Sequence, residues 1–242
     1  MKIHAENIGV HYMINDFRYR GLKDVVLQKL KGICTAKEFW ALDNISFELK
    51  TGDFLGIVGN SGAGKSTLLK TITGIIPPSR GLLHVEGKVV AILEFDAGFD
   101  GDMTVKENTF LRGTLLGYSK EFIKEAYQSI IEFAELEEFQ DRFFRQLSSG
   151  MKSRLDFSFA CLAKPDILII DEVLSVCDES FLVKSEKRMQ DIIDGGAITI
   201  LVSHSLKQIK SMCNKVLWLD RGKQMAFGDA KKIIEQYEDF LK

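Results

Sequence analysis

The chain has 242 residues, of which 45% are hydrophobic and 27% are charged, so it can bury one large core and a smaller lobe. Its formal net charge of −2 gives no general attraction to nucleic acid or to an acidic membrane surface. No apolar run approaches the roughly 18 residues that a membrane-spanning helix needs.

The chain begins with two strand patterns joined by a long connection. The first pattern ends near Tyr12, and in the second Ile45, Phe47 and Leu49 alternate as a strand with one buried face. Residues 16–39 lengthen the connection, and their apolar spacing indicates an amphipathic helix. Basic residues outnumber acidic ones there, an excess that usually marks only a solvated face.

A glycine-rich loop at residues 59–67, called the P-loop below, follows the apolar run Phe54–Val58. It fits the pattern G-x-x-x-x-G-K-S/T. Its small residues let backbone N–H groups turn inward around phosphate oxygens, and the following helix adds its positive dipole end. We expect Lys65 to reach the β- and γ-phosphates and Ser66 to bind Mg²⁺. A turn that merely caps a strand is the simpler alternative, which the spacing and flanks disfavour. The expected nucleotide contacts come from Gly59, Asn60, Ser61, Gly62, Ala63, Gly64, Lys65, Ser66 and Thr67.

The middle of the chain changes from strands to helices. Two short strand patterns follow the P-loop helix, and the second, at 88–93, ends at Glu94. From about residue 95 to 163 the pattern is helical, and Thr104 with Glu107 forms a capping-box pair that opens the first of these helices. We therefore predict a helical lobe inserted between the P-loop and the next buried strand.

A small-residue turn opens a further helix late in this lobe. The run LSSGMK places Ser148, Ser149 and Gly150 ahead of apolar residues that share one helix face. Helix N-termini favour anions, so this turn is a second anion-binding device in the same chain. A serine that caps a structural helix is the simpler alternative. One chain cannot easily bring both devices to one triphosphate if they lie on separate subdomains.

A short, fully apolar run, Ile167–Ile170, ends in Asp171 and Glu172. It predicts a buried parallel strand that delivers two carboxylates at its carboxyl end, where ligands bind in open α/β sheets. Asp171 is placed to hold Mg²⁺ through water, and Glu172 to take the proton from the attacking water. Ordinary solvated turn residues are the alternative. The elements that complete the predicted α/β fold are a strand ending at His204, a hairpin turning at 220–223 and a helix near 230–241.

Together these motifs resemble the ATP-binding cassette (ABC) family of transporter ATPases over nearly the whole chain. In that family the small-residue turn of one subunit covers the γ-phosphate held by the P-loop of the other. The family pattern is LSGGQ; the run LSSGM at 147–151 departs from it at two positions and retains Ser148 and Gly150. The resemblance implies a single nucleotide-binding domain with a mixed-sheet core, an antiparallel β-subdomain and an inserted helical subdomain. The core would comprise 1–94 and 164–242, and the helical subdomain 95–163.

The resemblance also assigns roles to four isolated residues. Tyr12 matches the aromatic that stacks on adenine, although half-buried packing is the simpler alternative. Asp178, in SVCD where the family has SALD, matches a residue that bridges the two subunits. His204 matches the switch histidine that senses the γ-phosphate, and would be catalytic with Glu172 and Lys65. Glu94 replaces a glutamine that touches Mg²⁺ or water; it can bind either but cannot donate an amide hydrogen bond, and a surface acid is the alternative.

Within the family, three features look like the branch that exports O-antigen, capsule or teichoic acid chains. They are the strand pattern that ends at Glu94, the run ALDNISF at 41–47 and the run SSGMKSRL at 148–155. That implies an ATPase using ATP and Mg²⁺, working as a homodimer beneath a separate polytopic permease on the cytoplasmic face of the plasma membrane. The cargo would be a lipid-linked glycan, with no nucleic-acid partner, and the 16–39 connection would help to receive its pyrophosphate end. The alternatives are a transporter ATPase for another substrate, a non-transport cassette ATPase and a catalytically silent module.

The four cysteines have no close spacing, so neither a zinc site nor a disulfide framework is indicated. They fit reduced, mostly buried thiols of a cytosolic protein.

Overall fold

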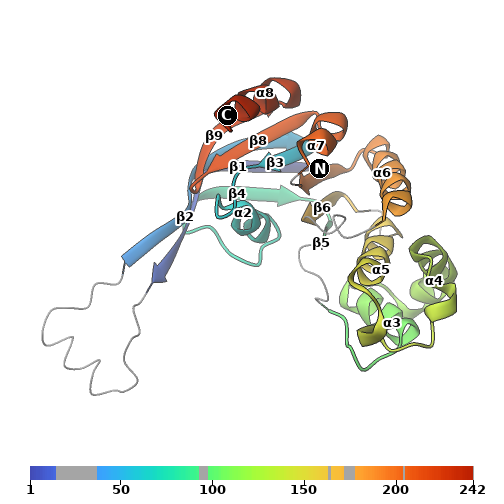
Figure 1. Ribbon diagram of the computed structural model, residues 1–242. Coiled ribbons are helices and arrows are strands. Elements are labelled where there is room, and N and C mark those ends of the chain that lie inside the picture. Colours follow the sequence, from blue (N-terminus) through green and yellow to red (C-terminus); the bar gives the residue numbers. More distant parts are fainter. Residues whose placement is uncertain (15–36, 93–97, 163–164, 172–177, 204, 242) are drawn as a thin grey trace, which may run out of the picture.

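The computed structural model describes residues 1–14, 37–92, 98–162, 165–171, 178–203 and 205–241 (Figure 1). The helix predicted in the connection after the first strand lies outside these ranges, as do Glu94, Glu172 and His204. None of the helices in the described ranges combines the length and the apolar character that crossing a bilayer requires.

Nine strands of the described ranges form one mixed sheet in the order β4-β1-β2-β9-β8-β3-β7-β6-β5. The strands are β1 (Lys2–Ile14), β2 (Lys37–Lys50), β3 (Phe54–Val58), β4 (Arg80–Glu86), β5 (Val89–Ile92), β6 (Ile167–Asp171), β7 (Ile198–Val202), β8 (Lys215–Asp220) and β9 (Lys223–Asp229). The helices are α2 (Lys65–Ile72), α3 (Val105–Leu115), α4 (Lys120–Ala134), α5 (Ser149–Leu162), α6 (Glu179–Asp194), α7 (Leu206–Met212) and α8 (Ala230–Phe240), and short 3₁₀ turns lie at Glu137–Phe139 and Phe144–Gln146.

The sheet has a parallel and an antiparallel part. The strands β8, β3, β7, β6 and β5 are parallel neighbours, and β9 closes this part as a hairpin with β8. The strands β4, β1 and β2 are antiparallel, and they meet the parallel part where Asp43 of β2 pairs with Lys223 of β9. In the parallel part Val202 pairs with both Ile57 and Asp171, so β3, β6 and β7 end at the same edge. The predicted mixed α/β sheet is confirmed.

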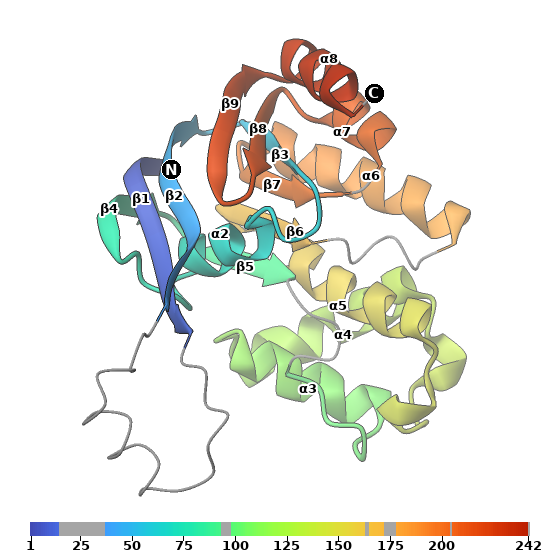
Figure 2. The ribbon, with the colours of Figure 1, turned by 60° about the vertical axis from the view of Figure 1, so that its left-hand side comes forward.

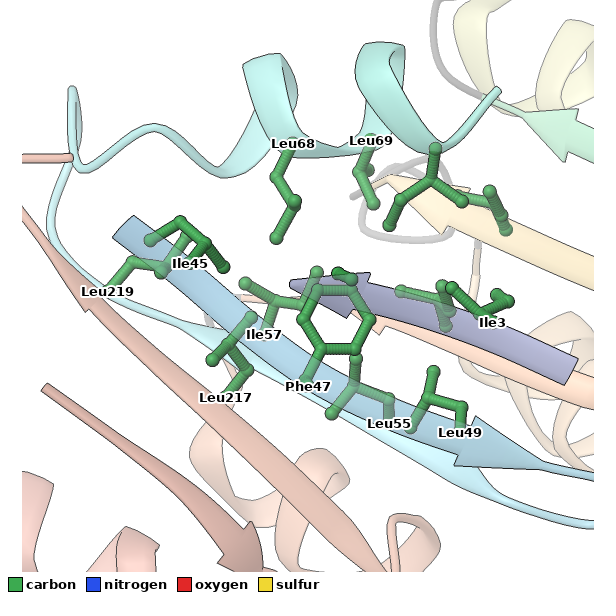
Figure 3. Packing of buried hydrophobic residues seen from close by; sticks show 14 of the residues in the cluster. Ile3, Ile45, Phe47, Leu49, Leu55, Ile57, Leu68, Leu69, Leu217 and Leu219 are labelled. Carbon is green, nitrogen blue, oxygen red and sulfur yellow. The ribbon is translucent and has the colours of Figure 1, made fainter. Parts of the chain in front are cut away.

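Strand alternation divides the apolar residues between two cores. In β3, Leu55 and Ile57 face the core under α2, whereas Phe54 and Val58 face the core that also contains residues of α6, α7 and α8. Figure 3 shows Leu68 and Leu69 of α2 pointing into the layer formed by β1, β2, β3 and β8. Both leucines are fully buried, and each stabilises the fold by about 2 kcal/mol relative to an exposed position.

The helices α3, α4 and α5 form a lobe to one side of the sheet (Figures 1 and 2). They have their own core, to which Val105 of α3, Ile131 of α4 and Leu155 of α5 contribute. The capping box predicted at Thr104 and Glu107 is confirmed: the Thr104 hydroxyl accepts from the Glu107 N–H at 3.2 Å, and the Glu107 carboxylate accepts from the Thr104 N–H at 2.8 Å.

The start of β2 corrects one sequence-based boundary. The sequence predicts a connection that runs to residue 39, but β2 begins at Lys37 because Glu38 and Phe39 pair with Met13 and Tyr12 of β1. Cross-strand pairing extends the strand beyond its apolar alternation, which local pattern cannot reveal. Of the cysteines, Cys213 is free and buried, as predicted, and its burial raises the pKa of its thiol.

Candidate nucleotide-binding site

The P-loop joins β3 to α2 and is packed so closely that two of its residues must be glycine. A Cβ atom on Gly59 would lie 2.2 Å from the carbonyl oxygen of Leu219, and one on Gly64 would lie 2.7 Å from that of Ala41. Gly64 also has a φ of 102°, in the left-handed region that favours glycine. The backbone of the loop is therefore fixed between β2 and β8 before any ligand binds.

Lys65 is folded back over this loop. Its ammonium donates hydrogen bonds to the carbonyl oxygens of Gly59 at 2.8 Å and Asn60 at 3.2 Å. Because Lys65 is also the first residue of α2, its charge lies beside the positive end of the helix dipole. An ammonium and a helix N-terminus at one place form an environment that favours a polyanion such as a triphosphate.

Ser66 and Asp171 bring a hydroxyl and a carboxylate together from distant parts of the chain. The Ser66 hydroxyl donates to Oδ2 of Asp171 at 3.4 Å, joining the start of α2 to the end of β6. Both are hard oxygen ligands of the kind that Mg²⁺ prefers, so the residues present fit that ion. The described residues contain no cluster of three or more His, Cys, Asp or Glu side chains placed to hold a metal.

A pocket of about 430 Å³ extends from the P-loop to an aromatic end. Residues of the P-loop form most of its lining, and Tyr12 of β1 also lines it. The structure therefore brings the residue predicted to stack on adenine into the pocket of the predicted phosphate-binding loop. The pocket is lined by Tyr12, Phe39, Ala41, Ser61, Gly62, Ala63, Gly64, Lys65, Ser66 and Thr67.

The small-residue turn predicted to bind anions lies elsewhere, at the start of α5 in the helical lobe. Ser148 and Ser149 are exposed, and neither they nor Gly150 line the P-loop pocket. The Ser148 hydroxyl accepts a hydrogen bond from the Met151 N–H at 3.3 Å. This is the contact expected if Ser148 simply caps a structural helix. The two turns therefore begin different helices, the P-loop at α2 and the Ser148 turn at α5.

The sequence model described as ABC transporter matches residues 42–175. This chain belongs to the ABC transporter family. A teichoic acids export ATP-binding protein, TagH of Bacillus anthracis, is 39% identical over 241 residues, which are 100% of this chain and 43% of that protein. An O-antigen export system ATP-binding protein, RfbB of Klebsiella pneumoniae, is 36% identical over 245 residues, covering 99% of this chain and 98% of that protein. The chain thus spans less than half of the first relative and nearly all of the second.

Solved structures show the same fold for this ABC family member. An ATP-binding subunit of an ABC transporter superimposes with a TM-score of 0.77 at 21% identity, covering 98% of this chain and 94% of that one. A dimeric ATP-binding cassette in a post-hydrolysis state, bound to ADP and phosphate, has a TM-score of 0.77 at 19% identity, covering 94% of this chain and 98% of that one. The fold class expected from the resemblance is confirmed.

Asp178, which the resemblance places between two subunits, has partners within its own chain. It caps α6: its Oδ1 accepts hydrogen bonds from the Phe181 N–H at 2.9 Å and the Ser180 hydroxyl at 2.6 Å. Its Oδ2 lies 3.7 Å from a guanidinium nitrogen of Arg154 in α5. The hydrogen bond from Ser180, with smaller contributions from Phe181 and Arg154, lowers the pKa of the Asp178 carboxyl.

Arg154 is a residue of this cassette that sequence reasoning missed. Its side chain is only 15% exposed and pairs with Glu135, the residue that follows α4, at 2.9 Å, as well as with Asp178. Glu135 in turn lies 3.2 Å from Lys184 of α6. Arg154 is four residues after Gly150 and therefore on the same face of α5, which is the signal that would have drawn attention to it.

Three predicted site residues, Glu94, Glu172 and His204, lie outside the described ranges. The strands that precede two of them are described: β6 ends at Asp171 and β7 at Val202, and these two residues are paired in the sheet. The roles predicted for Glu94, Glu172 and His204 stay predictions.

Proposed function

We propose that this chain is the ATP-hydrolysing subunit of a transporter that exports a lipid-linked polysaccharide across the cytoplasmic membrane. The observation that supports ATP binding is one pocket lined by Tyr12, Lys65 and Ser66, with the Ser66 hydroxyl hydrogen-bonded to Asp171. The relatives named for teichoic acid and O-antigen export, at 36% to 39% identity over nearly the whole chain, support the cargo class. The cargo would be a glycan of one of these types.

Each pocket residue has a part in binding or turnover. Lys65 would exchange its carbonyl partners for the β- and γ-phosphate oxygens, and Tyr12 would stack on the base. Ser66, Asp171 and Glu94 would hold Mg²⁺, which supplies charge neutralisation of the phosphates when it is bound. Glu172 would accept the proton of the attacking water, and His204 would contact the γ-phosphate. Catalysis of this kind depends on positioning and on charge stabilisation.

The working form would be a homodimer. Ser148 and Gly150 do not line the pocket of their own chain, and Ser148 is exposed, so a second copy is the natural source of this contact. Asp178, near the same end of the lobe, would contact that copy. The dimeric cassette with a similar fold supports the arrangement only at the level of fold. We further propose one nucleotide-binding domain over 1–242, with helical subdomain 95–163, bound to a separate polytopic permease at the cytoplasmic face of the membrane.

The first experiment replaces the proposed general base. Glu172→Gln is expected to retain ATP binding and to slow turnover by roughly 10²- to 10⁴-fold, the usual range for a lost general base. ATP turnover and ATP affinity are measured on the purified chain, alone and with its membrane partner. Glu121→Gln, an exposed acid in the first turn of α4, is the matched control and should retain full turnover. Near-normal turnover of Glu172→Gln would remove Glu172 from this role.

The second experiment tests transport. Tagged Glu172→Gln protein is copurified from its native membranes with ATP present, and bound proteins and glycans are identified by mass spectrometry. A polytopic membrane protein with a polyprenyl-linked sugar chain would support the exporter proposal. A soluble or nucleic-acid partner without any membrane protein would overturn it.

A further inference from the structure

A second aromatic side chain, Phe39 of β2, lines the nucleotide pocket together with Tyr12 of β1. The two residues are directly opposite each other in the antiparallel pairing of these strands. Residues in such a pair share one face of the sheet, with Cβ atoms about 5 Å apart. Both rings are therefore presented to the same end of the pocket, the end away from the P-loop.

The other face of this strand pair is already covered. His11 is opposite Trp40, with ring centroids 5.2 Å apart, and the Arg80 guanidinium lies 4.7 Å over the Trp40 ring. By contrast, Tyr12 is 40% and Phe39 51% exposed, and neither contacts another aromatic ring of the described residues. Among the described residues, none covers the exposed part of these two rings with an aromatic contact on the face that borders the pocket.

The strand β2 sets the separation between the rings and the P-loop. Ala41 borders the loop, since its carbonyl oxygen would lie 2.7 Å from a Cβ on Gly64. Phe39 is two residues before Ala41 on β2, both residues line the pocket, and a strand rises about 3.4 Å per residue. The backbone of Phe39 is therefore about 7 Å from that of Ala41. This separation leaves room for a ribose between the phosphate-binding loop and the two rings.

We propose that Phe39 is a nucleobase-binding residue that contacts the base of ATP from β2 while Tyr12 contacts it from β1. This inference rests on the proposed function, because it assigns a further contact to the same nucleotide. The described residues that line the pocket include no Asn, Gln, Asp or Glu, whose side chains would read the edge of a base. Stacking tolerates any base, so the site should favour the larger purines over pyrimidines and distinguish adenine from guanine weakly.

The test measures ADP and inorganic pyrophosphate binding to the purified full chain by titration calorimetry with Mg²⁺ present. Phe39→Ala is expected to weaken ADP binding about 10-fold and to leave pyrophosphate binding unchanged, because pyrophosphate has no base. Phe39→Leu removes the ring but retains apolar bulk, and should resemble Phe39→Ala; Phe39→Trp should bind ADP at least as well as the unaltered chain. Met13→Ala is the control, since Met13 is 56% exposed at the same end of the strand pair but alternates to the other face.

The proposal would be supported if Phe39→Ala weakened ADP binding but not pyrophosphate binding, and weakened ADP binding more than UDP binding. Equal weakening of ADP and pyrophosphate would overturn it, because Phe39 would then act on the shape of the pocket. Unchanged ADP binding in both Phe39→Ala and Phe39→Leu would also overturn it, while the proposed ATP site would stand. An unaltered chain that binds neither ligand would overturn the proposed function, and this inference with it.

Discussion

The P-loop and the small-residue turn of α5 both expose a helix N-terminus suited to phosphate, but they are held in place differently. The P-loop is enclosed by backbone, with the carbonyl groups of Ala41 and Leu219 against Gly64 and Gly59. The turn at Ser148 is exposed on a lobe with its own core. Its helix contacts the Asp178 end of α6 through the ion pair of Arg154 with Asp178 and through the ring contact of Phe157 with Phe181.

The comparison indicates where movement is possible. A backbone packed closely enough to exclude a Cβ atom cannot shift without a clash, so the P-loop is preorganised. Ion pairs between flexible side chains, by contrast, can lengthen and re-form without a steric clash. We therefore expect ligand-dependent movement to be concentrated between α5 and α6, and the P-loop to keep its conformation.

The largest effect is expected at the P-loop. Lys65→Met removes an ammonium that would make charge-assisted hydrogen bonds to the phosphates, so ATP affinity should fall by about 100-fold. Calorimetric titration of ATP with the purified protein measures the change. Lys124→Met, in the exposed part of α4, should leave affinity unaltered. A fall of less than about threefold would show that preorganised backbone N–H groups suffice without Lys65.

A smaller effect is expected at the link between α5 and α6. Arg154→Met removes a largely buried guanidinium with two carboxylate partners, and should lower the free energy of unfolding by about 2 kcal/mol. It should also reduce ATP turnover while leaving ATP affinity unchanged, because the P-loop is not involved. Urea unfolding and ATPase assays measure the two quantities.

The control for Arg154 is Arg145→Met. Arg145 pairs with Asp102, but its side chain is 62% exposed, so its removal should cost well under about 1 kcal/mol. If Arg154→Met were no more destabilising than Arg145→Met, the ion pairs would not be what joins the lobe to α6.

The smallest effect is expected at the capping box inside the lobe. Thr104→Ala should lower the free energy of unfolding by about 1 kcal/mol without changing ATP affinity. Thr104→Ser, which retains the hydroxyl cap, is the matched control. Unfolding measured at neutral pH separates the two variants, and equal stability would mean that the cap contributes nothing.

The capping box also predicts a dependence on pH. Hydrogen bonds from Thr104 hold the pKa of Glu107 below its ordinary value of 4.5. A lowered folded-state pKa stabilises the protein fully above the unfolded-state pKa, and that stabilisation disappears as the pH falls through the lowered value. Part of the acid sensitivity of unfolding should therefore disappear in Glu107→Gln. An unaltered pH profile between pH 5 and 3, roughly the window around these pKa values, would contradict this assignment.

Much of this molecule could be predicted from local pattern. The alternation of Ile45, Phe47 and Leu49, the apolar run before Asp171 and the capping pair at Thr104 each act within a few residues, and the structure has all three as expected. The boundary of β2 could not be predicted in this way. Lys37 to Phe39 become strand only because they pair with β1, which is more than 20 positions away in the sequence.

The sequence by itself determined the kinds of element and the P-loop, since helix periodicity, strand alternation and glycine geometry are local properties of the chain. Only the tertiary structure decided which distant residues meet: Ser66 with Asp171, Phe39 with Tyr12, and Arg154 with Glu135 and Asp178. Such contacts depend on strand register and on how a lobe packs against a sheet. These are set by the burial of whole faces, and no short segment encodes them.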